Sequence, residues 1–183
     1  CDTGACADET VPADLTLTMA AVKQGLLKLP AFEYTGELEV IGIGLLENLD
    51  AWNQLTTSAA DAEMVSALLP ERGPASHKGT FGAALVAAGS TSYTGAALLA
   101  GKAAYRVGAG LVTMAVPEPL HAILAGHIPE ATWLPLPHEH GFISEEAAYA
   151  ILSSHERITA MLIGPGLGGR HATKLFVEHL LPA

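Results

Sequence analysis

Residues 76–117, SHKGTFGAALVAAGSTSYTGAALLAGKAAYRVGAGLVTMAVP, decide the fold of this chain. In residues 83–88, small and branched apolar side chains follow one another without polar alternation, which is typical of a parallel strand buried on both faces. The turn-prone residues 89–94 predict a loop, and Thr94 is placed to cap a helix over residues 95–107.

A second strand completes this unit. Residues 111–116 are again apolar, and Gly108 before them is expected to end the helix. The helix carries little bulk, so its axis can lie close to a sheet; its small residues are Ala96, Ala97, Ala100, Gly101, Ala103 and Ala104. The stretch therefore predicts a βαβ crossover in an α/β fold with a mainly parallel sheet, where ligands bind at the carboxyl ends of the strands.

A strand, a glycine turn and a helix occur a second time near the end of the chain. Residues 158–163 predict a strand, residues 164–169 (GPGLGG) a turn, and residues 171–181 a helix. At such turns, free backbone N–H groups and the positive end of the helix face the same space, and glycine lets a phosphate come close. Two such turns suit a nucleotide or dinucleotide; the alternative is that the glycines only permit tight turns.

The other elements are predicted from the spacing of apolar residues and from the Pro, Gly and capping residues that bound them. A domain boundary is expected at residues 47–57, where the pattern is lost, and Ser144 is expected to cap a helix. The remaining predictions are strands at 13–20, 37–45 and 128–137, and helices at 58–69, 118–125 and 144–153.

Charge and cysteine content limit the class of partner. The 183 residues carry 19 Asp and Glu against nine Lys and Arg, a net charge of -10, and have no basic stripe. We therefore expect no nucleic-acid or membrane partner, and a small molecule instead. Cys1 and Cys6 are too few for a disulfide framework, so a reducing, cytoplasmic location is expected.

Three named motifs fit poorly. Residues 164–169 satisfy G-x-G-x-x-G, but the acidic residue expected about 20 positions later cannot be checked within this sequence. Residues 95–102 imitate a P-loop with the wrong spacing, and their lysine lies inside the predicted helix. His138 and His140 have no further metal-ligand cluster nearby, so they are interpreted as loop residues and no metal site is predicted.

The order of several motifs carries a family resemblance. HKGTFGAALVAAGS (77–90), TGAALLAGKAAYRVGAGLVTMAVPE (94–118), PEA (129–131) and IGPGLG (163–168) closely resemble the NAD(P)H-hydrate dehydratase family of ribokinase-like fold. DTGACADETVPADLTLTMAAVKQGLL (2–27) and YTGELEVIGIG (34–44) resemble the end of the NAD(P)H-hydrate epimerase domain.

The resemblance implies a partial three-layer α/β/α sandwich preceded by the tail of a Rossmann-like epimerase domain. Residues 1–46 would be the epimerase remnant, 47–57 a linker and 58–183 the first half of the dehydratase domain. The implied parent is a bifunctional repair enzyme, both lyase and isomerase. It would use ADP or ATP with Mg²⁺ to dehydrate hydrated NADH or NADPH, need K⁺ for epimerisation and form a homo-oligomer.

The resemblance also implies binding residues. Those for the substrate are Gly95, Ala96, Gly164, Gly166 and Gly168. Lys78 matches a family motif and is a candidate phosphate contact, although a solvated surface lysine is the alternative. Lys23 falls where the epimerases often carry a lysine near the substrate, and a surface role is equally compatible.

The family's catalytic Asp, its nucleotide-binding segment and its potassium-binding Ser match no residue of this chain. We therefore expect a fragment without a catalytic residue, inactive by itself. Two other functions stay open: a ribokinase-like kinase of a small molecule, and a non-catalytic nucleotide-binding module. In the dehydratase, phosphorylation of the ring hydroxyl would let the ring nitrogen expel phosphate, which requires positioning and charge stabilisation from the protein.

Overall fold

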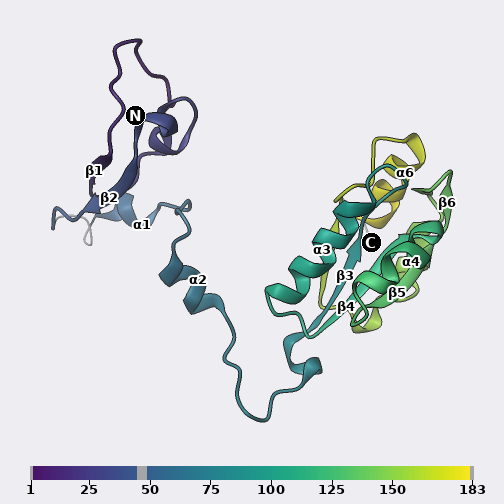
Figure 1. Cartoon of the computed structure of the whole chain (residues 1–183). Helices are drawn as coiled ribbons and strands as arrows, with labels where there is room; N and C mark the ends of the chain where they lie inside the picture. The colour runs from purple at the N-terminus through teal and green to yellow at the C-terminus, as the bar shows by residue number, and fades with distance from the viewer. Residues whose placement is uncertain (1, 45–48, 182–183) are drawn as a thin grey trace. The chain divides into compact units, whose positions relative to one another are not determined.

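The computed structural model describes residues 2–44 and 49–181, and the chain divides into two compact units, Cys1–Leu69 and Pro70–Ala183 (Figure 1). No helix within these described ranges is both long and apolar enough to cross a bilayer.

The first unit contains one parallel pair of strands. Its elements are β1 (Leu15–Met19), η1 (Gln24–Leu27), η2 (Ala31–Tyr34), β2 (Glu37–Ile41), α1 (Asp50–Asn53) and α2 (Ala62–Leu68). The two strands predicted here are confirmed; β2 is shorter than predicted, and Leu45 lies outside the described residues. Helix α2 begins later than predicted because Asp61 caps it, accepting a hydrogen bond from the Met64 N–H at 2.8 Å.

The first unit buries little of its apolar surface. Its large side chains in β1 are exposed, Leu17 by 54% and Met19 by 65%. Among its described residues, those classed as buried are Gly4, Thr18, Gly25 and Thr35. Burial of apolar surface is the main stabilising contribution to a fold, so this unit has little to hold it together.

The second unit is built on a four-stranded parallel sheet of order β5-β4-β3-β8. Figure 1 labels β3, β4 and β5 of this sheet. The sheet consists of β3 (Ala83–Ala87), β4 (Leu111–Pro117), β5 (Thr132–Leu136) and β8 (Ala160–Ile163). Two further strands of the unit, β6 (His138–Glu139) and β7 (Phe142–Ile143), pair with each other. The helices of the second unit are η3 (Lys78–Phe81), α3 (Thr94–Arg106), α4 (Glu118–Leu124), η4 (Ala125–His127), α5 (Ala147–Leu152), η5 (His155–Arg157) and α6 (His171–Leu180).

Helices cover both faces of this sheet. Along β3, Leu85 and Ala87 pack into one buried cluster with side chains of α5 and α6, whereas Val86 packs into a second cluster with α3 and α4. Successive side chains of a strand point to opposite faces, so an unbroken apolar strand requires a layer on each side. The predicted three-layer α/β/α arrangement is confirmed.

Helix α3 lies close to the sheet, as its small residues predict. A Cβ added at Gly101 would lie 2.6 Å from the Met114 sulfur and 3.0 Å from Cδ1 of Ile128. The cap prediction is wrong, because α3 begins at Thr94 itself, and Tyr93 precedes it without a side-chain hydrogen bond to the helix.

The cap predicted at Ser144 is also wrong. Helix α5 begins at Ala147, and the Ser144 hydroxyl donates to Oε2 of Glu146 at 2.6 Å instead of accepting from the helix backbone. The backbone of Ser144 still contacts the helix start, because the Ala147 N–H donates to the Ser144 carbonyl at 3.2 Å.

The loop predicted around the two histidines is instead a hairpin. β6 and β7 pair antiparallel around His140 and Gly141, whose φ angles are 51° and 79°. Positive φ at both central residues is the type I′ arrangement that matches strand twist. His138 has a structural role, since its Nδ1 accepts from the Gly141 N–H at 3.2 Å.

Candidate functional site

The two predicted glycine turns leave the sheet at the same edge. β3 and β8 are parallel neighbours, with Ala84 opposite Ala160 and Ala87 opposite Ile163. The loop after β3 and the turn after β8 therefore both emerge at the carboxyl edge, where open α/β sheets bind their ligands.

The two turns are in direct contact. The Gly89 N–H donates to the Pro165 carbonyl at 2.8 Å. Gly166 has a φ of +72°, and a Cβ added to it would lie 2.7 Å from Cβ of Ala96 and 2.9 Å from Cβ of Tyr93. Only glycine fits there, so Gly166 and Ala96, predicted as binding residues from separate motifs, are brought together.

The other predicted glycines expose backbone at this edge. Gly95 lies in the first turn of α3 and Gly164 directly follows β8; neither would place a Cβ within 4 Å of another described atom. Gly168 has a φ of +79° and packs against the Phe142 ring. A Cβ added at Gly168 would lie 2.9 Å from Cε1 of Phe142. A ligand can therefore approach the backbone at Gly95 and Gly164 without meeting a side chain.

The β6–β7 hairpin is a third part of this edge that sequence reasoning missed. The Thr91 N–H donates to the Gly141 carbonyl at 2.9 Å, which joins the hairpin to the loop after β3. The guanidinium of Arg170, just before α6, lies 4.6 Å from the centre of the Phe142 ring. The only sequence signal for the hairpin was the His140–Gly141 pair, a less common type I′ sequence than Asn-Gly.

The two cavities beside the second turn differ in the charge of the residues that line them. A cavity of about 320 Å³ between the hairpin and α6 is lined by three carboxylates as well as Arg170; the carboxylates are Glu139, Glu145 and Glu146. The pKa of Glu146 is lowered, mainly by the hydrogen bond from the Ser144 hydroxyl, which favours the anionic form of the carboxyl group.

The other cavity is about 630 Å³ in volume and lies over the turn itself, between Gly164 and Val177. Its charged groups are Arg170, Lys174 and Glu178, and the last two form an ion pair of 3.5 Å. Anions are favoured near cations and helix N-termini and disfavoured near carboxylates. A phosphate therefore fits the turn side of this edge better than the hairpin side.

Lys78 does not join this group. It lies exposed in η3 before β3, and its carbonyl oxygen is 1.7 Å from the Cβ that would be added at Gly110, which precedes β4. Lys78 is therefore at the amino edge, separated from the glycine turns by the full length of β3, about 16 Å for its five residues.

Lys23 belongs to the first unit. Its ammonium group donates to the Met19 carbonyl at the end of β1 and to the Ala21 carbonyl at 3.0 Å. The residue thus lies at the carboxyl edge of the β1–β2 pair, with its charge turned toward its own loop.

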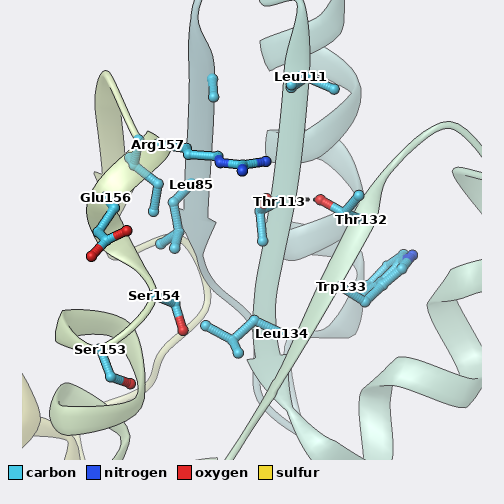
Figure 2. A pocket seen from close by; sticks show the side chains of 12 residues that line it. Leu85, Leu111, Thr113, Thr132, Trp133, Leu134, Ser153, Ser154, Glu156 and Arg157 are labelled. Atoms are coloured by element: carbon cyan, nitrogen blue, oxygen red, sulfur yellow. Dashed lines mark hydrogen bonds between the residues drawn. The ribbon is translucent and has the colours of Figure 1, made fainter.

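A further cavity, of about 450 Å³, is lined by side chains of three strands of the sheet and of the segment after α5, as Figure 2 shows. Leu85, Thr113 and Leu134 come from three adjacent strands, and Ser153 and Ser154 come from the segment after α5. The Thr113 hydroxyl shares a hydrogen bond of 2.8 Å with that of Thr132. None of the predicted binding residues lines this cavity.

Among the residues that the structure describes, no three His, Cys, Asp or Glu side chains are grouped so that they could hold a metal ion.

Known proteins resemble this chain over most of its length. A sequence model of the NAD(P)H-hydrate dehydratase family matches residues 84–183. The chain is 38% identical over 182 residues to the bifunctional NAD(P)H-hydrate repair enzyme Nnr of Moorella thermoacetica, covering 99% of this chain and 34% of that enzyme. It is 41% identical over 121 residues to the ADP-dependent (S)-NAD(P)H-hydrate dehydratase of Bacillus subtilis, covering 66% of this chain and 41% of that enzyme.

Solved structures agree with the fold. The ADP/ATP-dependent NAD(P)H-hydrate dehydratase from Bacillus subtilis, co-crystallised with ATP and Mg²⁺, superposes with a TM-score of 0.51 at 37% identity, over 66% of this chain and 41% of that one. A ribokinase-like superfamily protein from Enterococcus faecalis reaches a TM-score of 0.56 at 24% identity, over 67% and 40%. The expected ribokinase-like fold is confirmed.

These matches cover nearly all of this chain but only part of each repair enzyme. The chain spans about a third of the length of the curated repair enzymes, 34% for those of Moorella thermoacetica and Salinibacter ruber. Because the family match runs from residue 84 to residue 183, more than half of the 183 residues, the chain belongs to the NAD(P)H-hydrate dehydratase family.

Proposed function

We propose that the second unit supplies the substrate-binding edge of an ADP- or ATP-dependent (S)-NAD(P)H-hydrate dehydratase, a lyase that restores NADH or NADPH. The contact of Gly166 with Ala96 is the observation that carries the proposal. It unites two glycine turns, each of which precedes a helix N-terminus, at the carboxyl edge of one parallel sheet. Two adjacent groups of backbone donors suit the diphosphate of a dinucleotide.

In this proposal the chain binds and orients, and its backbone is the binding group. The N–H groups around Gly95 and Ala96 hold one side of the diphosphate, and those of the turn from Gly164 to Gly168 hold the other. ADP or ATP supplies the phosphoryl group that makes the ring hydroxyl a good leaving group. Fixing the dinucleotide then lowers the entropic part of the barrier, which is what phosphoryl transfer mainly requires of a protein.

We further propose that residues 1–46 are the end of an NAD(P)H-hydrate epimerase domain, residues 47–57 a linker and residues 58–183 part of the dehydratase domain. The bifunctional names of the relatives support this assignment, as does Lys23 at the carboxyl edge of its strand pair. A multifunctional, cytoplasmic, homo-oligomeric enzyme whose epimerase part uses K⁺ is the corresponding whole protein.

A chimera tests the dehydratase proposal. The 183 residues replace the matching segment of the Moorella thermoacetica enzyme, and hydrated NADPH is supplied with ADP and Mg²⁺. We expect the absorbance of reduced nicotinamide to return. A kinase of another small molecule, or a module that only binds nucleotides, would leave the hydrated substrate unchanged, and that result would contradict the proposal.

Gly166→Val in this chimera tests the site. The branched side chain cannot be placed beside Ala96 at a φ of +72°, so the turn must shift. We expect kcat/KM to fall about 100-fold, as a displacement of about 1 Å can produce. Gly126→Val is the matched control, because it introduces the same residue at a glycine where an added Cβ meets no described atom within 4 Å and which lines neither cavity beside the second turn. Circular dichroism verifies that both variants are folded.

A further inference from the structure

Ser90 has a buried hydroxyl that the fold does not use. The residue follows β3, its side chain is 0% exposed, and its Oγ has no hydrogen-bond partner among the described residues. The hydroxyl gives up its bonds to water on folding and receives none from these residues, which destabilises the protein. Ala87 and Ala88 just before it are equally buried, so this part of the chain accommodates alanine.

The backbone on either side of Ser90 joins the three loops of the carboxyl edge. Gly89 donates to Pro165 in the second glycine turn, and Thr91 donates to Gly141 in the hairpin. Ser90 therefore lies between two anchor points, and any movement of either loop changes its surroundings.

The two glycine turns close against each other beside this segment. The Tyr93 N–H donates to the Ser90 carbonyl at 2.9 Å, and Tyr93 packs with Ala96 on Gly166. The contact leaves no room even for a Cβ, so a ligand group that reached between the turns would have to move them apart. Ser90 belongs to the first of these turns and is tied to the second through Gly89, so a separation of the turns changes the surroundings of its hydroxyl.

We infer that Ser90 is a ligand-binding residue of this edge, whose hydroxyl donates to a phosphate oxygen of the dinucleotide when the turns move apart. The inference rests on the proposed function and adds a side-chain contact to its backbone donors. The hydroxyl is unpaired before binding and makes a charge-assisted hydrogen bond afterwards. Binding is therefore favoured for two reasons: the free-energy penalty of the unpaired buried group disappears, and a strong hydrogen bond forms. Ser90 would thus contribute to dinucleotide affinity at the expense of stability without the ligand.

Ser90→Ala in the 183-residue chain separates these two effects. Without added nucleotide, we expect its Tm to rise by about 3–8 °C, because the unpaired hydroxyl is gone. With NADPH as the probe, we expect calorimetry to give a Kd about 5–30-fold weaker than that of the unmodified chain. Ser92→Ala is the control, an exposed serine of the same loop, and should change neither value.

Each result decides the inference. A lower Tm for Ser90→Ala without nucleotide would mean that the hydroxyl is already paired within the fold, and would overturn it. An unchanged Kd would overturn it while leaving the proposed function in place, because the unmodified chain would still bind NADPH. If the unmodified chain binds no NADPH, both fail. Should Ser90→Ala not fold, the near-isosteric Ser90→Cys, a weak donor, is held to the same expected Kd.

Discussion

At the scale of single residues, the candidate site depends on conformations and contacts that only particular side chains allow. Gly166 is required by a positive φ and by the closeness of Ala96. The glycine in GPGLG was visible in the sequence, but its neighbour was not, because Ala96 lies in a different motif. Ser90 was also visible as a turn residue, whereas its unpaired hydroxyl became evident only from the packing around it.

The pair of Ser144 and Glu146 makes a prediction about pH. The hydroxyl of Ser144 lowers the pKa of the Glu146 carboxyl, so folding favours the carboxylate. The stabilisation is present above the unfolded pKa of about 4.3 and is lost as the pH falls through the lower folded pKa. Its size is small, because the carboxyl is exposed.

Ser144→Ala should therefore raise the pKa of Glu146 toward its ordinary value, as followed by carboxyl-carbon NMR titration. Ser153→Ala is a suitable control, since that hydroxyl donates to the Ala150 carbonyl and not to a carboxylate. A Glu146 pKa that stays low in Ser144→Ala would show that this hydrogen bond is not its main cause.

At the scale of elements, helix α3 shows how composition sets packing distance. Its small residues predicted a close approach to the sheet, and Gly101 is buried against Met114 and Ile128. Its first turn was mispredicted, since the preference of Thr for the N-cap position is only statistical and the chain enters α3 from Tyr93.

Gly101→Val should be destabilising. The added side chain would overlap Met114, which is fully buried, so we expect a loss of about 1–3 kcal/mol in the free energy of unfolding. Ala103→Val is the matched control, because Ala103 is exposed on the same helix and receives the same β-branched residue. Urea unfolding measures both, and equal losses would contradict the packing argument.

At the scale of the whole molecule, the two units differ in how much they bury. The second unit contains both buried clusters, whereas the described residues of the first bury no large apolar side chain. The free energy of local opening follows buried apolar contacts, so the units should open independently and at very different cost.

Hydrogen exchange measures this difference. We expect backbone amides of β3 and β4 to be the most protected and those of β1 and β2 to exchange close to unprotected rates. The two strand pairs are matched in geometry, since both are parallel, and they differ in burial. Equal protection in the two pairs would mean that the first unit has a source of stability other than its own packing.

The sequence by itself determined the type of the main elements, the two glycine turns, the parallel α/β class and the family, because each depends on local pattern. The tertiary structure decided which residues share an edge. The order β5-β4-β3-β8 places Gly166 on Ala96, adds the hairpin of β6 and β7, and leaves Lys78 at the opposite edge. Strand order is set by how apolar faces pack over long separations in the chain, and local pattern does not encode that choice.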